Sequence, residues 1–224
     1  HPSELDRAMK MEAGYAGRSW LFNDLNDTRV GERVGSPLVN AVSDANIEGY
    51  GNFPYDHEGT PSRRVWHIRD GIFEEFLNSR QTAAIMGVSP NGGYRANDAS
   101  MVPLIRMTNT FFLSGESDAD TLIKEVDHGY YVKGNRIPSI SESRENFRIS
   151  AMQIFEIEHG ELGQLYRDGA VTADSKDFFM HVDGVGSDLL MFPVPNCGKG
   201  QPMQAKRMGN GGPTMRSIAQ LVGP

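Results

Sequence analysis

The only cysteine of the chain, Cys197, lies in the run Asn196-Cys197-Gly198-Lys199-Gly200-Gln201-Pro202. Its small neighbours leave the sulfur accessible, and the positive charge of Lys199 favours the thiolate, the form that binds metal or attacks a carbonyl. Pro193 and Pro195 stiffen the chain before the cysteine, which suits a ligand that must be held in place. The alternative is that Cys197 is a small apolar residue buried in a turn.

The other end of the chain offers a second candidate for chemistry. His1 is followed by an acidic, increasingly helix-competent run that includes Glu4 and Asp6. This pattern predicts the tail of a helix over residues 2 to about 17. We therefore expect the chain to begin inside a helix.

Six segments in order along nearly the whole chain carry a resemblance to a known family. They are Tyr55-Asp56-His57-Glu58-Gly59, Asn91-Gly92-Gly93-Tyr94-Arg95, Arg106-Met107-Thr108-Asn109-Thr110, Gly186-Ser187-Asp188-Leu189, the Cys197 run, and Gly209-Asn210-Gly211-Gly212-Pro213-Thr214-Met215-Arg216. Together they resemble the C-terminal half of the TldD/PmbA family, described as metallopeptidases and earlier as modulators of DNA gyrase. The resemblance implies that residues 1–224 form the C-terminal metallopeptidase domain and that the N-terminal half is absent.

The resemblance also implies a metal site. In the TldD branch a helix carries His-Glu-x-x-x-His, and both histidines together with a distant cysteine hold the metal. His1 resembles the second histidine of that motif, and Cys197 stands where the third ligand is expected. Three ligands with an open fourth position are typical of catalytic zinc. The first histidine and the general-base glutamate would then lie upstream of His1, so this chain alone is expected to be inactive.

Further residues take expected roles around that metal and the substrate. Glu4 or Asp6 would accept the free imidazole N–H of His1, or both would simply be solvated acids. The resemblance suggests that the glycine-rich loop at Asn91 and Gly92 lines the substrate cleft. We place three more residues around the metal ligands or in the substrate site, namely Arg106, Asn109 and Lys199.

The sequence supports three hypotheses about function. The first is a zinc-dependent metallopeptidase that cleaves unfolded or small peptides, as a homodimer or as a heterodimer with a PmbA-like paralogue. The second is a non-catalytic PmbA-like subunit that shapes the substrate chamber of a protease complex. The third is a cysteine hydrolase with Cys197 as nucleophile, although no oxyanion-hole motif accompanies it. A His-Glu-x-x-x sequence before Pro2 would distinguish the first from the second.

Composition sets limits that agree with these hypotheses. A chain of 224 residues with 38% hydrophobic residues has enough apolar content for a real core. The net charge of −7 argues against a nucleic-acid-binding surface, which needs clustered Lys and Arg. One cysteine excludes an intrachain disulfide and fits a reducing cytoplasm. No apolar run approaches the ~20 residues of a membrane span.

Sequence patterns predict a single α+β domain, mostly antiparallel sheet with two or three helices. Strands are expected over residues 38–42, 64–69, 72–77, 106–113, 147–158, 162–171 and 177–182. Asp70-Gly71 is expected to be the turn of a hairpin. Helices are expected over 79–86, between Ser79 and Gly87, and over 118 to about 127, capped by Ser117. Residues 23–36 are expected to form a loop, as are the Gly/Pro/Asn-rich stretches 49–54, 87–98 and 196–213.

The remaining histidines are not expected to bind metal. In Asp56-His57-Glu58 consecutive extended residues alternate faces, so a structural or substrate-positioning role is favoured over a metal cluster. The other four histidines have no partner at ligand spacing, and a turn position predicts that His159 is exposed. These four are His67, His128, His159 and His181.

Overall fold

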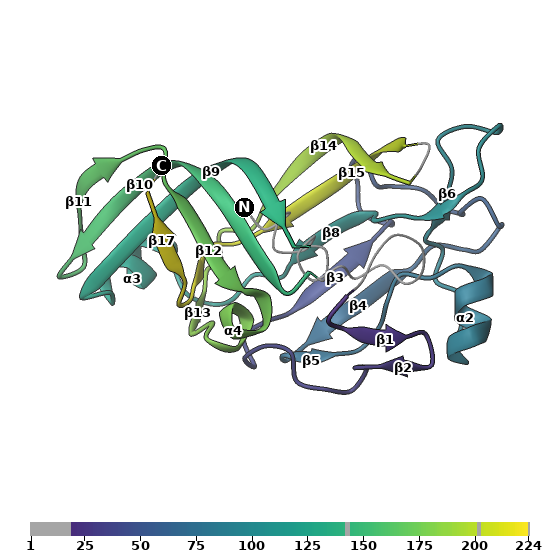
Figure 1. The fold of residues 1–224 in the computed structure, drawn as a ribbon, viewed down its shortest axis with the longest axis horizontal. Coiled ribbons are helices and arrows are strands. Elements are labelled where there is room, and N and C mark those ends of the chain that lie inside the picture. Colours follow the sequence, from purple (N-terminus) through teal and green to yellow (C-terminus); the bar gives the residue numbers. More distant parts are fainter. Residues whose placement is uncertain (1–18, 142–143, 201–202, 224) are drawn as a thin grey trace.

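A computed structural model describes residues 19–141, 144–200 and 203–223 (Figure 1). Three helices lie in this part of the chain: α2 (Arg80–Met86), α3 (Ala119–Lys124) and α4 (Ser175–Met180). The strands are β1 (Phe22–Asp24), β2 (Asp27–Thr28), β3 (Ala41–Asp44), β4 (Arg64–Arg69), β5 (Ile72–Phe73), β6 (Tyr94–Arg95), β7 (Leu104–Ile105), β8 (Asn109–Phe112), β9 (His128–Ile140), β10 (Asn146–Glu158), β11 (Glu161–Tyr166), β12 (Ala170–Asp174), β13 (Gly184–Val185), β14 (Leu190–Lys199), β15 (Gln204–Gly212), β16 (Met215–Arg216) and β17 (Gln220–Val222). The predicted helix over residues 2–17, with His1, Glu4 and Asp6, lies outside the described residues.

Two sheets form most of the molecule. Six strands pair in the order β14-β15-β8-β3-β4-β5, and all neighbours are antiparallel except β15 and β8. In the second sheet β9 runs along one edge of β10, while β11 and β12 share the other edge and β17 follows β12. The predicted α+β fold, mostly antiparallel sheet with two or three helices, is confirmed.

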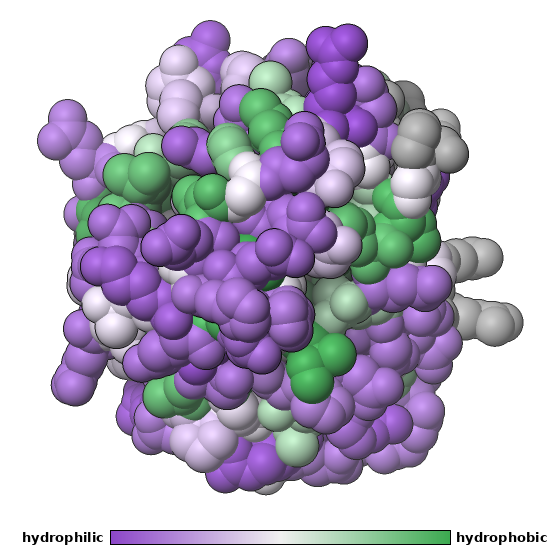
Figure 2. All heavy atoms as spheres, turned by 90° about the vertical axis from the view of Figure 1, so that its left-hand side faces the viewer, coloured by the Kyte–Doolittle hydropathy of each residue, from purple (hydrophilic) through white to green (hydrophobic). Residues whose placement is uncertain are grey.

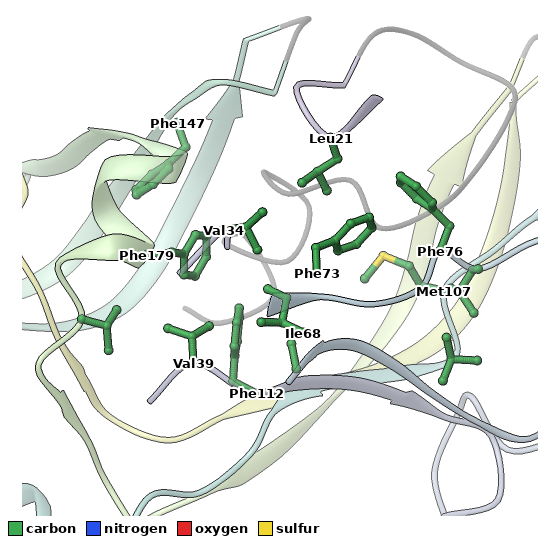
Figure 3. Packing of buried hydrophobic residues seen from close by; sticks show 14 of the residues in the cluster. Leu21, Val34, Val39, Ile68, Phe73, Phe76, Met107, Phe112, Phe147 and Phe179 are labelled. Carbon is green, nitrogen blue, oxygen red and sulfur yellow. The ribbon is translucent and has the colours of Figure 1, made fainter. Parts of the chain in front are cut away.

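Helix α4 connects the two sheets through a row of aromatic rings. Phe147 of β10 packs edge-on against Phe178, with ring centroids 5.5 Å apart. The next residue, Phe179, stacks on Phe112 of β8 at 5.6 Å. Figure 3 shows Phe147, Phe179 and Phe112 in one continuous cluster with side chains from the six-stranded sheet. Burial of such rings is the main source of stability, about 2–3 kcal/mol for each large apolar side chain.

Several local predictions are confirmed. Strands β4 and β5 form the expected hairpin, in which Ile68 lies opposite Phe73, but β5 ends at Phe73 and does not reach the predicted residue 77. Helix α2 begins after Ser79, whose side chain accepts a hydrogen bond from the Thr82 N–H, and it ends at Gly87 in the left-handed conformation. Strand β10 has nearly the predicted bounds.

Other local predictions are wrong. The sequence predicts a strand over residues 177–182, but α4 occupies most of them because the Asp174 carboxylate caps it, accepting from the Asp177 N–H at 3.0 Å. Asp118, not Ser117, caps α3, which ends at Lys124. The stretch 196–213 is not a loop, since β14 and β15 take up most of it. The expected return strand over 162–171 is interrupted between β11 and β12, and β9 has no counterpart among the predicted strands.

Candidate functional site

Cys197 lies in β14, the end strand of the six-stranded sheet, where it pairs with Lys206 of β15. It is half-buried, packs against the hydrophobic core and is not in a disulfide. Its own carbonyl oxygen accepts a hydrogen bond from the Arg106 guanidinium. The cysteine is therefore held on a paired strand, with its backbone carbonyl fixed by a buried guanidinium.

Arg106 is the largest fully buried side chain in the described part of the chain, with 1% of its surface exposed. Nη2 donates to the Cys197 carbonyl, and Nη1 donates to the Gln204 carbonyl at 2.9 Å. One guanidinium therefore binds both strands of the β14–β15 hairpin on either side of its turn. This planar fork of donors suits two carbonyl partners better than a lysine would.

Further polar contacts fix the same hairpin to the segment before Arg106. Lys199 Nζ donates to the Ile105 carbonyl at 2.9 Å. The Gln204 amide donates to the Val102 carbonyl at 2.7 Å, and its oxygen accepts from the Asn97 N–H at 3.0 Å. These contacts give Lys199 a positioning role within the chain, and its expected role toward the thiol or substrate stays a prediction.

The loop residues Asn91 and Gly92 are engaged inside the protein. Asn91 and Asn78 exchange reciprocal hydrogen bonds, each side-chain oxygen accepting from the other's backbone N–H at 3.0 and 2.9 Å. The Asn91 amide nitrogen also donates to the Phe76 carbonyl at 2.7 Å. At Gly92, φ is +77° and a Cβ would lie 2.7 Å from the Ser62 Cα. Both residues shape the loop, and their contact with substrate stays a prediction.

Asn109 is fully buried at the start of β8. Its amide nitrogen donates to the Ile47 carbonyl at 3.0 Å, and its oxygen accepts from the Gly51 N–H at the same distance. These two bonds fix the loop after β3 onto the sheet, next to β15. The geometry therefore gives Asn109 a role in holding this loop, and its contact with substrate stays a prediction.

Of the structural and substrate-positioning roles expected for Asp56-His57-Glu58, the hydrogen bonds support the structural one. The Asp56 carboxylate accepts from the backbone N–H groups of Glu58, Thr60 and Tyr94 at 2.9 to 3.1 Å. His57 Nδ1 accepts from the Ala96 N–H at 3.0 Å. The cluster therefore closes a turn and joins it to β6, instead of presenting three ligands to one ion.

His57 lies among cations, and this predicts its titration. Partial burial, followed by the charges of Lys206 and Arg95, lowers the pKa of His57 below its ordinary value of 6.5. The unfolded chain, with the higher pKa, binds the His57 proton more tightly than the folded chain does. The free energy of unfolding therefore falls as the pH drops below 6.5 towards the folded pKa. An NMR titration should find the pKa of His57 below 6.5, and Lys206→Gln should raise it, whereas Lys176→Gln, an exposed control, should not. A pKa above 6.5 in the unmodified protein would contradict the assignment.

Comparison with known proteins decides the family. The family model described as the PmbA/TldA metallopeptidase C-terminal domain matches residues 4–219. The chain belongs to this family. A metalloprotease of Methanocaldococcus jannaschii is 33% identical over 99% of this chain and 46% of its own length. The metalloprotease TldD homolog of Buchnera aphidicola is 30% identical over 87% of this chain and 40% of its length.

Solved structures of other proteins share the fold. A protein described as a modulator of DNA gyrase from Thermotoga maritima superposes with a TM-score of 0.71 at 20% identity, covering 98% of this chain and 44% of that one. TldE from Thermococcus kodakarensis gives 0.70 at 20% identity, with 88% and 42% covered. The chain spans about half the length of the curated relatives it matches. None of the helices in its described part is long and apolar enough to cross a membrane.

The sequence identifies Cys197, Arg106 and Lys199 but not two of their neighbours. Gln204 and Lys206 lie on β15, and the Lys206 ammonium donates to the Ala96 carbonyl. Burial, and then the charges of Arg95 and Arg106, lower the pKa of Lys206. Because the glycines of this stretch predict a loop, the sequence gives no pairing partner for either residue.

Proposed function

We propose that the full-length protein is a zinc-dependent metallopeptidase of the TldD type that cleaves unfolded or small peptides in the cytoplasm. It would act as a homodimer or as a heterodimer with a PmbA-like paralogue. The observation that carries the proposal is the position of Cys197, the expected third metal ligand, on a paired strand beside the buried Arg106. Membership of a metallopeptidase family supports it.

The donor set suits zinc. Cysteine thiolate and histidine imidazole favour zinc over magnesium or calcium, which prefer oxygen ligands. Cys197 and His1 would hold the ion together with a histidine upstream of His1. When bound, zinc polarises the peptide carbonyl and activates water.

The chain's own residues position the cysteine and offer a place for the peptide. Arg106 and Lys199 tie β14 to the segment beneath it, which limits the movement of Cys197. Strand β14 is the end strand of its sheet among the described residues. An extended peptide could pair with that edge through backbone hydrogen bonds, giving affinity with little side-chain selectivity.

Replacing Cys197 with serine in the full-length protein tests the proposal. We expect the zinc content, measured by plasma mass spectrometry, to fall by about one ion per chain, because a serine hydroxyl is a poor zinc ligand. Peptide cleavage should fall at least about a hundredfold, since the bound ion supplies several kcal/mol of transition-state stabilisation. The control Asn196→Ser, at the exposed neighbouring position, should keep both.

Three other results of this experiment would each favour a different conclusion. If Cys197→Ser kept both the zinc and the peptide cleavage, Cys197 would not be a ligand of the peptidase metal. Absence of metal and cleavage in the unmodified protein would favour the non-catalytic PmbA-like subunit. Cleavage that survives a chelator but is lost in Cys197→Ser would identify a cysteine hydrolase.

A further inference from the structure

Asp127, His128 and His159 form a compact cluster of side chains on the second sheet, which does not contain Cys197. Asp127 and His128 lie where α3 leads into β9, and His159 lies in the turn between β10 and β11. One ligand atom from each residue lies within 4.8 Å of the others. In Figure 1 this turn is near α3, at the end of the molecule opposite α2.

The backbone beneath the cluster is held by hydrogen bonds on both sides of the turn. The His159 N–H donates to the Asp127 carbonyl at 2.7 Å, and the Gly160 N–H donates to the Val126 carbonyl at 2.9 Å. Gly160 also packs so closely that a Cβ there would lie 2.5 Å from the Lys124 carbonyl oxygen. The side chains therefore project from two segments with a fixed separation.

The three ligand atoms lie close enough together to approach one ion. Asp127 Oδ2 lies 3.4 Å from His128 Nε2, and Asp127 Oδ1 accepts from His159 Nδ1 at 2.6 Å. A tetrahedral zinc with bonds of about 2.0–2.1 Å separates its ligand atoms by about 3.3 Å. The side chains of His128 and His159 are 67% and 77% exposed, so both imidazoles are free to turn towards a common ion.

The surroundings also favour a cation. His128 lies opposite Glu158, which in turn lies opposite Glu161 across the hairpin, so two further carboxylates flank the cluster. Figure 2 shows that hydrophilic residues cover most of this end of the molecule. Binding here would not require burial of an apolar side chain or desolvation of a deep site, which keeps the cost of binding low.

We propose that Asp127, His128 and His159 bind a divalent cation of the zinc class, in a site separate from the expected peptidase metal. Two imidazole nitrogens and one carboxylate oxygen favour zinc, nickel or copper over magnesium and calcium. Three protein ligands leave a position for water. The ion would cross-link the start of β9 to the β10–β11 turn, 31 residues away in the sequence from His128 to His159.

Calorimetric titration with zinc chloride tests the site in the full-length protein carrying Cys197→Ser, which removes the thiol from the expected peptidase metal. The parent protein should bind zinc, and His128→Asn or His159→Asn should lower the zinc affinity at least about tenfold. Loss of a residue that merely hydrogen-bonds to a metal ligand already costs about that much, and loss of the ligand itself should cost no less. His181→Asn, an exposed histidine at the end of α4, should leave the titration unchanged.

The double variant His128→Asn/His159→Asn provides the decisive comparison. Both residues are exposed, so its metal-free melting temperature should match that of the parent. Zinc should raise the melting temperature of the parent more than that of the double variant, because a ligand that binds the native state stabilises it. Equal zinc affinity in the parent and the double variant would overturn the proposal and leave the peptidase hypothesis unaffected.

Discussion

Replacing Arg106 with methionine is expected to lower the free energy of unfolding by about 3–5 kcal/mol. Methionine fills most of the volume but donates no hydrogen bond, so the Cys197 and Gln204 carbonyls lose their buried partner. Each buried polar group left unsatisfied costs about 1–3 kcal/mol. Relief of the cost of burying a guanidinium offsets part of this loss but not all of it.

Urea unfolding, followed by circular dichroism, measures the effect, and two further variants locate its cause. Arg106→Lys keeps the charge but has a single ammonium in place of the planar fork, so it should lose less than the methionine variant. Arg167→Met removes an arginine whose side chain is 84% exposed and should change stability by less than about 0.5 kcal/mol. A loss for Arg106→Met as small as that for Arg167→Met would show that the buried guanidinium does not hold the hairpin together.

Elements with strong local signals were predictable from the sequence. The β4–β5 hairpin follows from the Asp70-Gly71 turn between two apolar runs. Helix α2 follows from Ser79 and Gly87, which satisfy its ends without any distant contact. Strand β10 follows from an alternation of buried and less buried side chains that is regular over residues 146–152. In each case the physical cause lies within about ten residues of the element.

The errors arise where distant contacts override local preference. Gly209, Gly211 and Gly212 predict a loop, yet they belong to β15, an interior strand of the six-stranded sheet. A Cβ at Gly209 would lie 2.3 Å from Asn109 Oδ1, and one at Gly211 would lie 2.2 Å from Met191 Sδ. Glycine is used there because neighbouring atoms approach the backbone closely, not because the chain is flexible. The sequence does not show which neighbour makes that approach.

In the candidate sites, too, some features were predictable from the sequence and others depend on distant contacts. Cys197 and Arg106 could be selected from residue type and family resemblance, but their direct contact depends on how β14 lies over the segment before β8. The sequence shows no partner for His128 or His159 because its patterns do not predict β9. The register between β9 and β10 places His128 beside the turn that contains His159. That register is set by strand pairing over more than ten residues.

Replacing Gly71 with alanine is expected to lower the free energy of unfolding by about 3–5 kcal/mol, the sum of a backbone cost and a clash. Gly71 has a φ of +76°, and a Cβ there would lie 2.2 Å from the Gly35 carbonyl oxygen and 2.4 Å from that of Ser36. The Gly71 carbonyl also accepts from the Val34 N–H at 2.8 Å, so the clashing segment cannot retreat without loss of that bond. The turn itself was evident from the sequence, but this close approach was not.

Gly31→Ala is the matched control, because Gly31 has a φ of +88° and a Cβ added there would have no atom within 4 Å. Only the unfavourable positive φ then affects Gly31→Ala, whose free energy of unfolding should fall by about 1 kcal/mol. The difference between the two variants in urea unfolding therefore measures the clash of the β4–β5 turn with the 35–36 segment. Equal losses for Gly71→Ala and Gly31→Ala would mean that this segment yields freely, and the packing of the turn would then contribute little to the sheet that carries Cys197.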